Sequence, residues 1–343
     1  MLQELRVNNN YEPQLLTYKE KPLEQGLVRV KSLFGAPKHG TELTIYKKRP
    51  YEDIYYDEEE FIFKKNYTSQ SVIGMGLGNM WIGKIIEISG SVEGFALGQR
   101  VAGYGHLAST HDVEPSELLI MPDHMSWQEA VCYDPMQFAL SGLRDASCRI
   151  GDAVLISGLG AIGQMAAQAA KLTGASLVAV SDPLEIRRKI ALDNGADIAF
   201  NPVSEDLGLL LRGMTDGNGV DVVIETSGNF TAVEQCTRAL GYMGNMALVG
   251  CYSSCIVPID LGGEAHFNQQ NIFFSRACSN PNRDYPRWDF ARICRESWKI
   301  MANGKIHCEN VVSPIVEFTE CDKEYDRYIA KNPEESIKMG VKF

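Results

Sequence analysis

The middle of the chain alternates between two kinds of segment, and this alternation constrains the fold more than any other feature. Runs such as AVLISG and SLVAVSD, rich in Val, Ile and Leu, predict buried strands, and runs such as AIGQMAAQAAKLTG predict helices. The alternation continues through LEIRRKIALDNGAD, GVDVVIETSG, TAVEQCTRALGYMG and NMALVGCY. Strands and helices that alternate with short turns are typical of an α/β fold with a parallel, doubly wound sheet.

A glycine motif follows the first of these strands and opens the first helix. In GLGAIG, Gly158 permits a tight turn, Gly160 lets the backbone approach a pyrophosphate, and Gly163 allows close packing of helix on strand. The helix start presents free N–H groups to phosphate charge. Asp182 closes the second strand nineteen residues after Gly163, where a carboxylate would accept hydrogen bonds from a ribose 2′-hydroxyl. The motif predicts a dinucleotide site that favours NAD.

Two alternatives stay open for this motif. The carboxylate of Asp182 repels a 2′-phosphate, but Arg187 and Arg188 follow closely and could accommodate one, so NADP remains an alternative cofactor. A structural glycine turn with a helix-capping Asp182 is the second alternative, and four matching features in register count against it.

The first third of the sequence predicts a β-rich, barrel-like domain, because short β-type runs such as GLVRVKSLF and WIGKIIEISG alternate there with Gly and Pro. The acidic stretch YEDIYYDEEEFIFKK is interpreted as a solvated loop. The tail from about Arg292 predicts a helix, a strand, a second helix and a last strand. We expect a first domain over 1–135, a nucleotide-binding domain over 136–290, and a return to the first domain over 291–343.

Bulk properties exclude several partners. The net charge of −11 argues against a nucleic-acid partner, which would require a basic face. The N-terminus shows no basic region followed by an apolar one, so no signal peptide is predicted. No apolar run of about 20 residues occurs, so no membrane span is predicted. Nine scattered cysteines predict free thiols in a reducing cytoplasm. Cys251 and Cys255 lie close enough for a redox pair, although such thiols are more often small buried hydrophobes.

Beyond these motifs, the chain resembles the medium-chain dehydrogenase/reductase superfamily nearly end to end. The resemblance rests on HGTELTIYK, ALGQRVAGYGH, MPDHMSWQEA, DPMQFALSGL, GVDVVIETSGN, MALVG and SIKMGVKF, which occur in that family's order. It implies a GroES-like β-barrel domain joined to a Rossmann domain. It also implies that Ile162 packs behind the nicotinamide ring and that Lys338 contacts the pyrophosphate. By the same resemblance, Ser227, Val249 and Gly250 line the cofactor channel.

The sequence departs from this family at the metal positions. By the resemblance, a Cys would stand at His39, the His-Glu pair of GHE at Asn79 and Met80, and the Glu of an EP pair at Asp134. The four cysteines of a structural zinc lobe are absent. Because an amide is a poor zinc ligand, we expect no catalytic metal, with His39 and Asp134 as the residues that could still hold one and His106 as a substitute ligand. The pattern resembles a zinc-independent branch that includes bacteriochlorophyllide-type dehydrogenases.

Without zinc, another group must remove the alcohol proton as hydride leaves. His39 is the first candidate for this base, because imidazole titrates near neutral pH. By the resemblance, Thr41 relays the substrate proton. Asp134 would orient His39 or act as the base, and Asn79 would donate a hydrogen bond to a substrate oxygen. The structural alternatives are a satisfied histidine, a turn-capping Thr41 and a helix-capping Asp134.

Three functions are compatible with these residues. The first is an NAD-dependent, zinc-independent oxidoreductase acting on a hydroxyl or ketone of a small molecule, such as a sugar or cyclic alcohol. The second is a quinone or enoyl reductase of the same superfamily, and the third is a dinucleotide-binding protein without turnover. The apolar segment NIFFSRACS (271–279) predicts an edge strand that joins two copies, and hence a homodimer or homotetramer.

Overall fold

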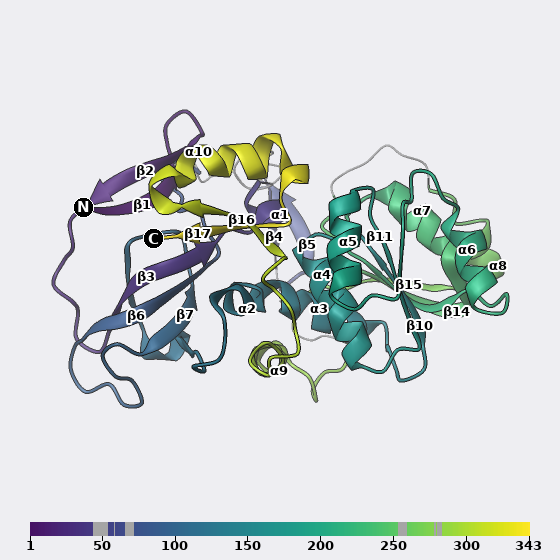
Figure 1. The fold of residues 1–343 in the computed structure, drawn as a ribbon, viewed down its shortest axis with the longest axis horizontal. Helices are drawn as coiled ribbons and strands as arrows, with labels where there is room; N and C mark the ends of the chain where they lie inside the picture. Colours follow the sequence, from purple (N-terminus) through teal and green to yellow (C-terminus); the bar gives the residue numbers. More distant parts are fainter. Residues whose placement is uncertain (44–53, 58, 66–71, 253–258, 278, 280–282) are drawn as a thin grey trace. The chain divides into compact units, whose positions relative to one another are not determined.

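The computed structural model describes residues 1–43, 54–57, 59–65, 72–252, 259–277, 279 and 283–343, which divide into two compact units (Figure 1). Unit 1 comprises Met1–Val131 and Val312–Phe343, and unit 2 comprises Cys132–Val311. Unit 1 is therefore discontinuous in sequence, and unit 2 is inserted between its two parts.

Unit 2 is built on a parallel sheet with the strand order β12-β11-β10-β13-β14-β15. This is the order of a doubly wound nucleotide-binding sheet. The predicted α/β class with a GroES-like and a Rossmann part is confirmed. The strands are β10 (Ala153–Ser157), β11 (Leu177–Ser181), β12 (Ile198–Phe200), β13 (Val220–Glu225), β14 (Leu240–Leu248) and β15 (Asn271–Phe274).

Helices cover both faces of this sheet. Figure 1 shows α4 and α5 on one side and α6 and α7 on the other. Ala-rich composition favours α4, and Asp206 and Asp289 cap α6 and α9 by accepting hydrogen bonds from Leu209 N and Arg292 N. The helices are α3 (Tyr133–Asp145), α4 (Ala161–Leu172), α5 (Glu185–Asp193), α6 (Leu207–Met214), α7 (Phe230–Ala239), α8 (Glu264–Phe267) and α9 (Phe290–Met301).

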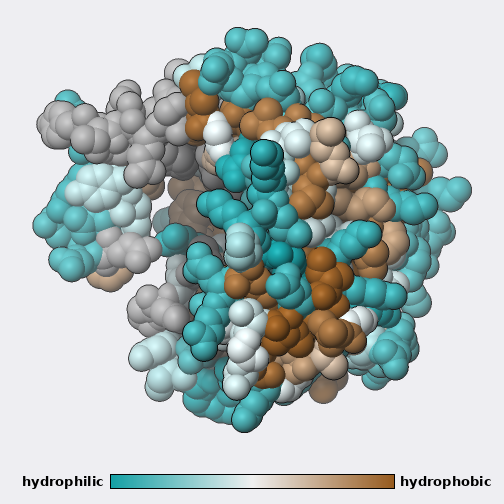
Figure 2. Space-filling view, turned by 90° about the vertical axis from the view of Figure 1, so that its left-hand side faces the viewer, coloured by the Kyte–Doolittle hydropathy of each residue, from teal (hydrophilic) through white to brown (hydrophobic). Residues whose placement is uncertain are grey.

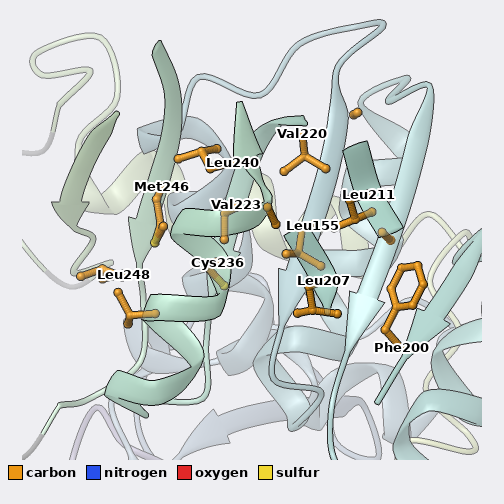
Figure 3. Close-up of a cluster of buried hydrophobic side chains, with 14 residues drawn as sticks. Leu155, Phe200, Leu207, Leu211, Val220, Val223, Cys236, Leu240, Met246 and Leu248 are labelled. Atoms are coloured by element: carbon orange, nitrogen blue, oxygen red, sulfur yellow. The ribbon is translucent and has the colours of Figure 1, made fainter. Parts of the chain in front are cut away.

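One core cluster of unit 2 lies between the sheet and helices α6 and α7. Figure 3 shows Leu155 and Val223 of the central strands packed with Leu207 and Leu211 of α6 and Cys236 of α7. Burial of such side chains contributes roughly 1.5–3 kcal/mol each. Strands β10 and β11 are apolar up to their final serine and almost wholly buried, because helices exclude water from both faces. This packing holds the strand ends, and the loops that follow them, in fixed positions.

Unit 1 is a mostly antiparallel, barrel-like sheet with the strand order β16-β17-β3-β6-β7-β9, and β8 also pairs with β3. Its strands are β3 (Val28–Ala36), β6 (Met80–Ile88), β7 (Arg100–Tyr104), β8 (Thr110–Val113), β9 (Leu119–Ile120), β16 (Val312–Glu317) and β17 (Lys338–Lys342). A hairpin, β1 (Leu2–Val7) and β2 (Pro13–Tyr18), and the short helices α1 (His39–Leu43), α2 (Trp127–Val131) and α10 (Cys321–Tyr325) complete it.

The two sequence segments of unit 1 share one core. Leu5, Leu77 and Leu107 from the first segment cluster with Tyr325 and Val341 from the second. Strand β17 pairs with β3, so the last residues form part of the main sheet. The expected order of a helix, a strand, a helix and a last strand in the tail is confirmed by α9, β16, α10 and β17.

Three sequence expectations differ from the structure. The acidic stretch is not a plain loop, because β4 (Ile54–Asp57) and β5 (Ile62–Lys65) form an antiparallel hairpin. Isoleucine, tyrosine and phenylalanine residues favour strands there despite the acidic turn. The helix expected through GYMG ends at Ala239, and β14 begins at Leu240. Residues 291–311 group with unit 2, because α9 packs against α3.

The exposed surface is mixed. Figure 2 shows a face on which hydrophilic residues surround smaller hydrophobic areas. Within the described part of the chain, none of the helices has the length and apolar character that crossing a membrane requires.

Candidate cofactor cavity and substrate-side residues

A cavity of about 590 Å³ lies at the carboxyl edge of the unit 2 sheet. Segments that follow four parallel strands line it, and the strand order reverses between β10 and β13. Open α/β sheets bind ligands at such switch points. Its lining comprises Ser157, Gly158, Leu159, Gly160, Ser181, Asp182, Pro183, Leu184, Arg187, Pro202, Val203, Thr226, Ser227, Asn229, Thr231, Ala232 and Gln235.

The three positions of the motif require glycine for different physical reasons. A Cβ on Gly163 would lie 1.9 Å from the Gly158 carbonyl oxygen, and a Cβ on Gly158 would lie 2.7 Å from Ser227 N. Both glycines are therefore required by packing within the protein. A Cβ on Gly160 would meet nothing within 4 Å. Since Gly160 lines the cavity at the start of α4, space for a phosphate group against the backbone explains it best.

Asp182 lies beside this glycine turn and is 3% exposed. Its Oδ2 accepts a hydrogen bond from Leu159 N (2.8 Å), and its Oδ1 accepts one from Leu184 N (2.8 Å). A carboxylate oxygen has two lone pairs, so each oxygen retains one for a hydroxyl donor from the cavity. The structure places Asp182 against the glycine turn, and its contact with a ribose hydroxyl stays a prediction.

The two arginines after Asp182 are placed differently. Arg187 lines the cavity, with Nη1 3.7 Å from Asp182 Oδ2. Arg188 is outside the lining, and its Nη1 donates to the carbonyl oxygens of Asp182 and Pro183. Of the two arginines that sequence suggested for a phosphate, the structure brings Arg187 to the cavity.

A buried carboxylate that the sequence analysis missed holds the loop after β13. Glu225 accepts hydrogen bonds from the backbone N–H groups of Ser227 (2.8 Å) and Gly228 (3.2 Å) and from the hydroxyls of Ser227 and Tyr252. Burial raises the pKa of Glu225 above its ordinary value. This network fixes Ser227, which lines the cavity, and its contact with a cofactor stays a prediction.

Besides Gly163, four predicted cofactor residues lie outside the cavity lining. Ile162 is in the first turn of α4, and Val249 and Gly250 donate backbone N–H groups to Glu225 O. Lys338 is on β17 in unit 1, 3% exposed, and its Nζ donates to Pro37 O (3.2 Å). The roles of these four residues stay predictions.

Sequence analysis also missed Thr231 and Gln235 of α7 and Pro202–Val203 after β12, which line the cavity. A usable signal existed, because the carboxyl ends of parallel strands meet at one edge. The residues that follow every predicted strand, and not only the first two, were therefore candidates.

Among the residues predicted to act on the substrate, His39 begins α1 and contacts the last part of unit 1. Its Nε2 accepts a hydrogen bond from Met339 N (3.0 Å), and its Nδ1 lies 3.5 Å from Ser336 Oγ. The Ser336 hydroxyl donates to Tyr328 O, so its oxygen can accept from His39 Nδ1–H. These contacts favour the neutral ring, because a proton on Nε2 would face the Met339 N–H group.

Glu42 anchors the helix that carries His39. The side chain is 8% exposed and accepts hydrogen bonds from Lys38 N (2.7 Å), Gly78 N (3.1 Å) and Tyr325 Oη (2.5 Å). Burial raises the pKa of Glu42, and the Tyr325 hydrogen bond opposes the rise. Glu42 therefore links α1 to α10 and to the segment that carries Asn79.

Asn79 has an unsatisfied donor. Its Nδ2 is buried and makes no hydrogen bond to any described residue. A buried N–H group without an acceptor costs about 1–3 kcal/mol. A ligand oxygen at this position would recover that cost.

Asp134 and Thr41 are the other two residues predicted to be catalytic. Asp134 lies in the first turn of α3 and is buried, and Cys132 is the capping position, so Asp134 is not the helix cap. Thr41 lies within α1, and its side chain falls outside the described residues. Nothing in the structure tests its relay role. Cys255 of the suggested redox pair also falls outside them.

Comparisons with known proteins agree with this geometry. The sequence pattern of the family described as zinc-binding dehydrogenase matches residues 161–291. D-guloside 3-dehydrogenase of Escherichia coli K12 is 42% identical over 337 residues, which cover 96% of each chain. The chain belongs to the zinc-binding dehydrogenase family.

Solved structures of other dehydrogenases share the fold. Galactitol-1-phosphate dehydrogenase from Escherichia coli superposes with a TM-score of 0.78 at 18% identity, covering 99% of this chain and 100% of that one. A zinc-binding dehydrogenase from Sinorhizobium meliloti bound to NADP also gives 0.78 at 18% identity, covering 100% and 99%. These likenesses show the fold, and the 42% identity to D-guloside 3-dehydrogenase together with the family match shows that the chain is an oxidoreductase of a family that typically binds a nicotinamide dinucleotide.

The residues that stand at the family's zinc-ligand positions in this chain are poorly suited to bind a metal ion. The Nε2 lone pair of His39 is occupied by Met339 N–H, and Met80 is wholly buried in β6. Among the described residues, no group of three or more His, Cys, Asp or Glu side chains is arranged to hold a metal ion. His106, the suggested substitute ligand, pairs instead with Glu4 (2.8 Å).

Proposed function

We propose that this chain is an NAD-dependent, zinc-independent dehydrogenase that oxidises a secondary hydroxyl of a sugar or glycoside. The observation that carries the proposal is the open space at Gly160 beside the carboxylate of Asp182. The substrate class is supported by the 42% identity, nearly end to end, to D-guloside 3-dehydrogenase.

In this proposal, the unit 2 cavity binds the cofactor. The start of α4 and the backbone at Gly160 would hold the pyrophosphate, and the free lone pairs of Asp182 would accept hydrogen bonds from the ribose hydroxyls. The carboxylate disfavours a 2′-phosphate, whereas Arg187 attracts one. NAD is proposed because Asp182 Oδ2 lies within 3.7 Å of Arg187 and offsets its charge. When bound, the nicotinamide accepts the hydride.

The residues proposed to act on the substrate are Asn79, His39, Thr41 and Asp134. Asn79 Nδ2 would donate to the oxygen at the reacting carbon, which fills its missing acceptor. His39 and Asp134 are the two groups proposed to take the hydroxyl proton. The Met339 N–H bond to Nε2 makes His39 the weaker base, because protonation there would break that bond. Thr41 is proposed as the relay.

The test is an assay of purified protein with NAD and an alkyl D-guloside, monitored by the absorbance of reduced nicotinamide. We expect turnover that persists after dialysis against a chelator, with zinc far below one equivalent per chain. Stoichiometric zinc, with activity lost on its removal, would overturn the zinc-independent part. Absence of turnover with gulosides, sugars and cyclic alcohols, in protein that binds NAD, would overturn the substrate class.

A further inference from the structure

Unit 2 contains a second cavity, of about 560 Å³, at the opposite end of α4 from Gly160. It shares no lining residue with the cofactor cavity. Because α4 has 12 residues and rises about 1.5 Å per residue, the two cavities are roughly 18 Å apart. The lining comprises Leu140, Leu143, Arg144, Ser147, Cys148, Arg149, Ala169, Leu172, Thr173, Asp284, Ile300, Asn303 and Lys305.

One part of this lining is apolar. Leu140 and Leu143 come from α3, Ala169 and Leu172 from α4, and Ile300 from α9. Three helices thus supply a hydrocarbon surface to a space within the 300–1,000 Å³ typical of small-molecule sites. An apolar group of a ligand would be removed from water there.

The polar part of the lining is cationic. Arg144, Arg149 and Lys305 contribute three positive charges, and Asp284 is the lone carboxylate of the lining. Asp284 is paired with Arg144, whose guanidinium also stacks on Trp288 at 3.6 Å. A local excess of two positive charges stands out in a chain of net charge −11.

These cations retain capacity for an anion. The side chains of Arg149 and Lys305 form no ion pair with any described residue, and Arg144 Nε is buried without a hydrogen-bond acceptor. Ser147, Thr173 and Asn303 add hydroxyl and amide groups. Burial raises the pKa of the Cys148 thiol, which therefore stays neutral and does not repel an anion.

We propose that this cavity binds a small amphipathic anion, namely a carboxylate, sulfonate or phosphate ester with an aryl or alkyl body. The apolar body contacts the α3, α4 and α9 side chains, and the anionic group contacts Arg144, Arg149 and Lys305. Binding there is independent of the cofactor, because the two cavities lie at opposite ends of α4.

The test compares two fluorescent probes that differ by one charge, anilinonaphthalene sulfonate and uncharged N-phenylnaphthylamine, each titrated in excess NAD. The sulfonate should saturate one site. The double variant Arg149→Gln/Lys305→Gln should weaken sulfonate binding about ten-fold, the loss of two charge-assisted contacts, and leave the uncharged probe unaffected. Lys323→Gln/Lys331→Gln, which removes two exposed cations of unit 1, should change neither probe.

Alkylation of cysteine thiols tests whether the sulfonate probe binds in this cavity. The sulfonate should slow iodoacetamide labelling of Cys148, which lines the cavity, and leave labelling of the exposed Cys251 unchanged. Equal losses of sulfonate binding in the two double variants, or labelling of Cys148 that the sulfonate does not slow, would overturn the proposal. Equal affinity for the charged and uncharged probes would do the same.

Discussion

The side chain of Asp182 bears both on the conformation of the glycine turn and on the choice between NAD and NADP. It stabilises the glycine turn through Leu159 N and presents its remaining lone pairs to the cavity. Asp182→Ser should therefore weaken NAD binding and reduce discrimination against NADP, because Arg187 would then attract the 2′-phosphate without an opposing carboxylate. Titrations of the wild type and the variant with both dinucleotides would measure this. Tighter binding of NADP than NAD by the wild type would contradict the ribose assignment.

A second prediction separates the candidate bases. If a positioned group takes the proton, its removal should lower turnover by about 10²–10⁴-fold while NAD affinity stays nearly unchanged. We expect the larger loss in Asp134→Asn and the smaller in His39→Ala, since the His39 Nε2 lone pair is already engaged. The pH dependence of turnover should vanish in whichever variant removes the base. Near-normal rates in both variants would mean that neither residue carries the proton.

Sequence spacing predicted some residue contacts and not others. Asp182 stands nineteen positions after Gly163, a spacing that spans one helix and one strand, so its place in the cavity beside Gly158 and Gly160 follows from local structure. His39 meets Met339, and Glu42 meets Tyr325, across most of the chain. No periodicity encodes such contacts, because they depend on β17 pairing with β3.

At the scale of elements, the parallel, doubly wound sheet of unit 2 followed from the alternation of strands and helices. The β4–β5 hairpin was not predicted. The acidic residues of its turn indicated a loop, although its strands contain aromatic and β-branched side chains. The cavity residues after β12 and on α7 were missed for a different reason. They belong to segments without a motif of their own, and only the parallel topology brings them to the glycine turn.

Strand β15 is the basis of a prediction about assembly. It is an edge strand of the unit 2 sheet, and Phe274 at its end is 72% exposed. An exposed apolar edge strand favours pairing with a second copy. We expect a homodimer or homotetramer, and Phe274→Glu should shift it toward the monomer, because two like charges would meet at the joined edges.

Light scattering at micromolar concentration measures the oligomeric state of the wild type and of Phe274→Glu. Phe267→Glu is the matched control, since Phe267 is also highly exposed but lies on α8 and not on the strand. A monomeric wild type would refute the prediction.

At the scale of the whole molecule, His111 couples stability to pH. Burial lowers the pKa of His111 to about 3, with the nearby His106 as a smaller cause, and Trp81 stacks on its ring at 4.3 Å. Between about pH 6.5 and pH 3 the unfolded chain binds a proton that the folded chain does not. The free energy of unfolding should therefore fall as pH decreases through this window, by an amount on the order of a few kcal/mol.

His111→Phe should reduce this slope, because it keeps the stack on Trp81 and removes the titrating group. It also removes Nε2, a buried atom without a hydrogen-bond partner, so the variant should unfold at a higher temperature at pH 5. Thermal unfolding of both proteins across the window would show it. An unchanged slope would assign the acid sensitivity to other groups.

The discontinuity of unit 1 has a consequence for synthesis. Unit 2 is one continuous segment and can fold as soon as Val311 has left the ribosome, whereas unit 1 must wait for β17 to pair with β3. His39 and Glu42 are translated early, yet Met339 and Tyr325, which hold them, arrive about 300 residues later. A nascent chain from which Val311 has emerged, but β17 has not, should thus acquire the unit 2 cavity before His39 and Glu42 gain their partners.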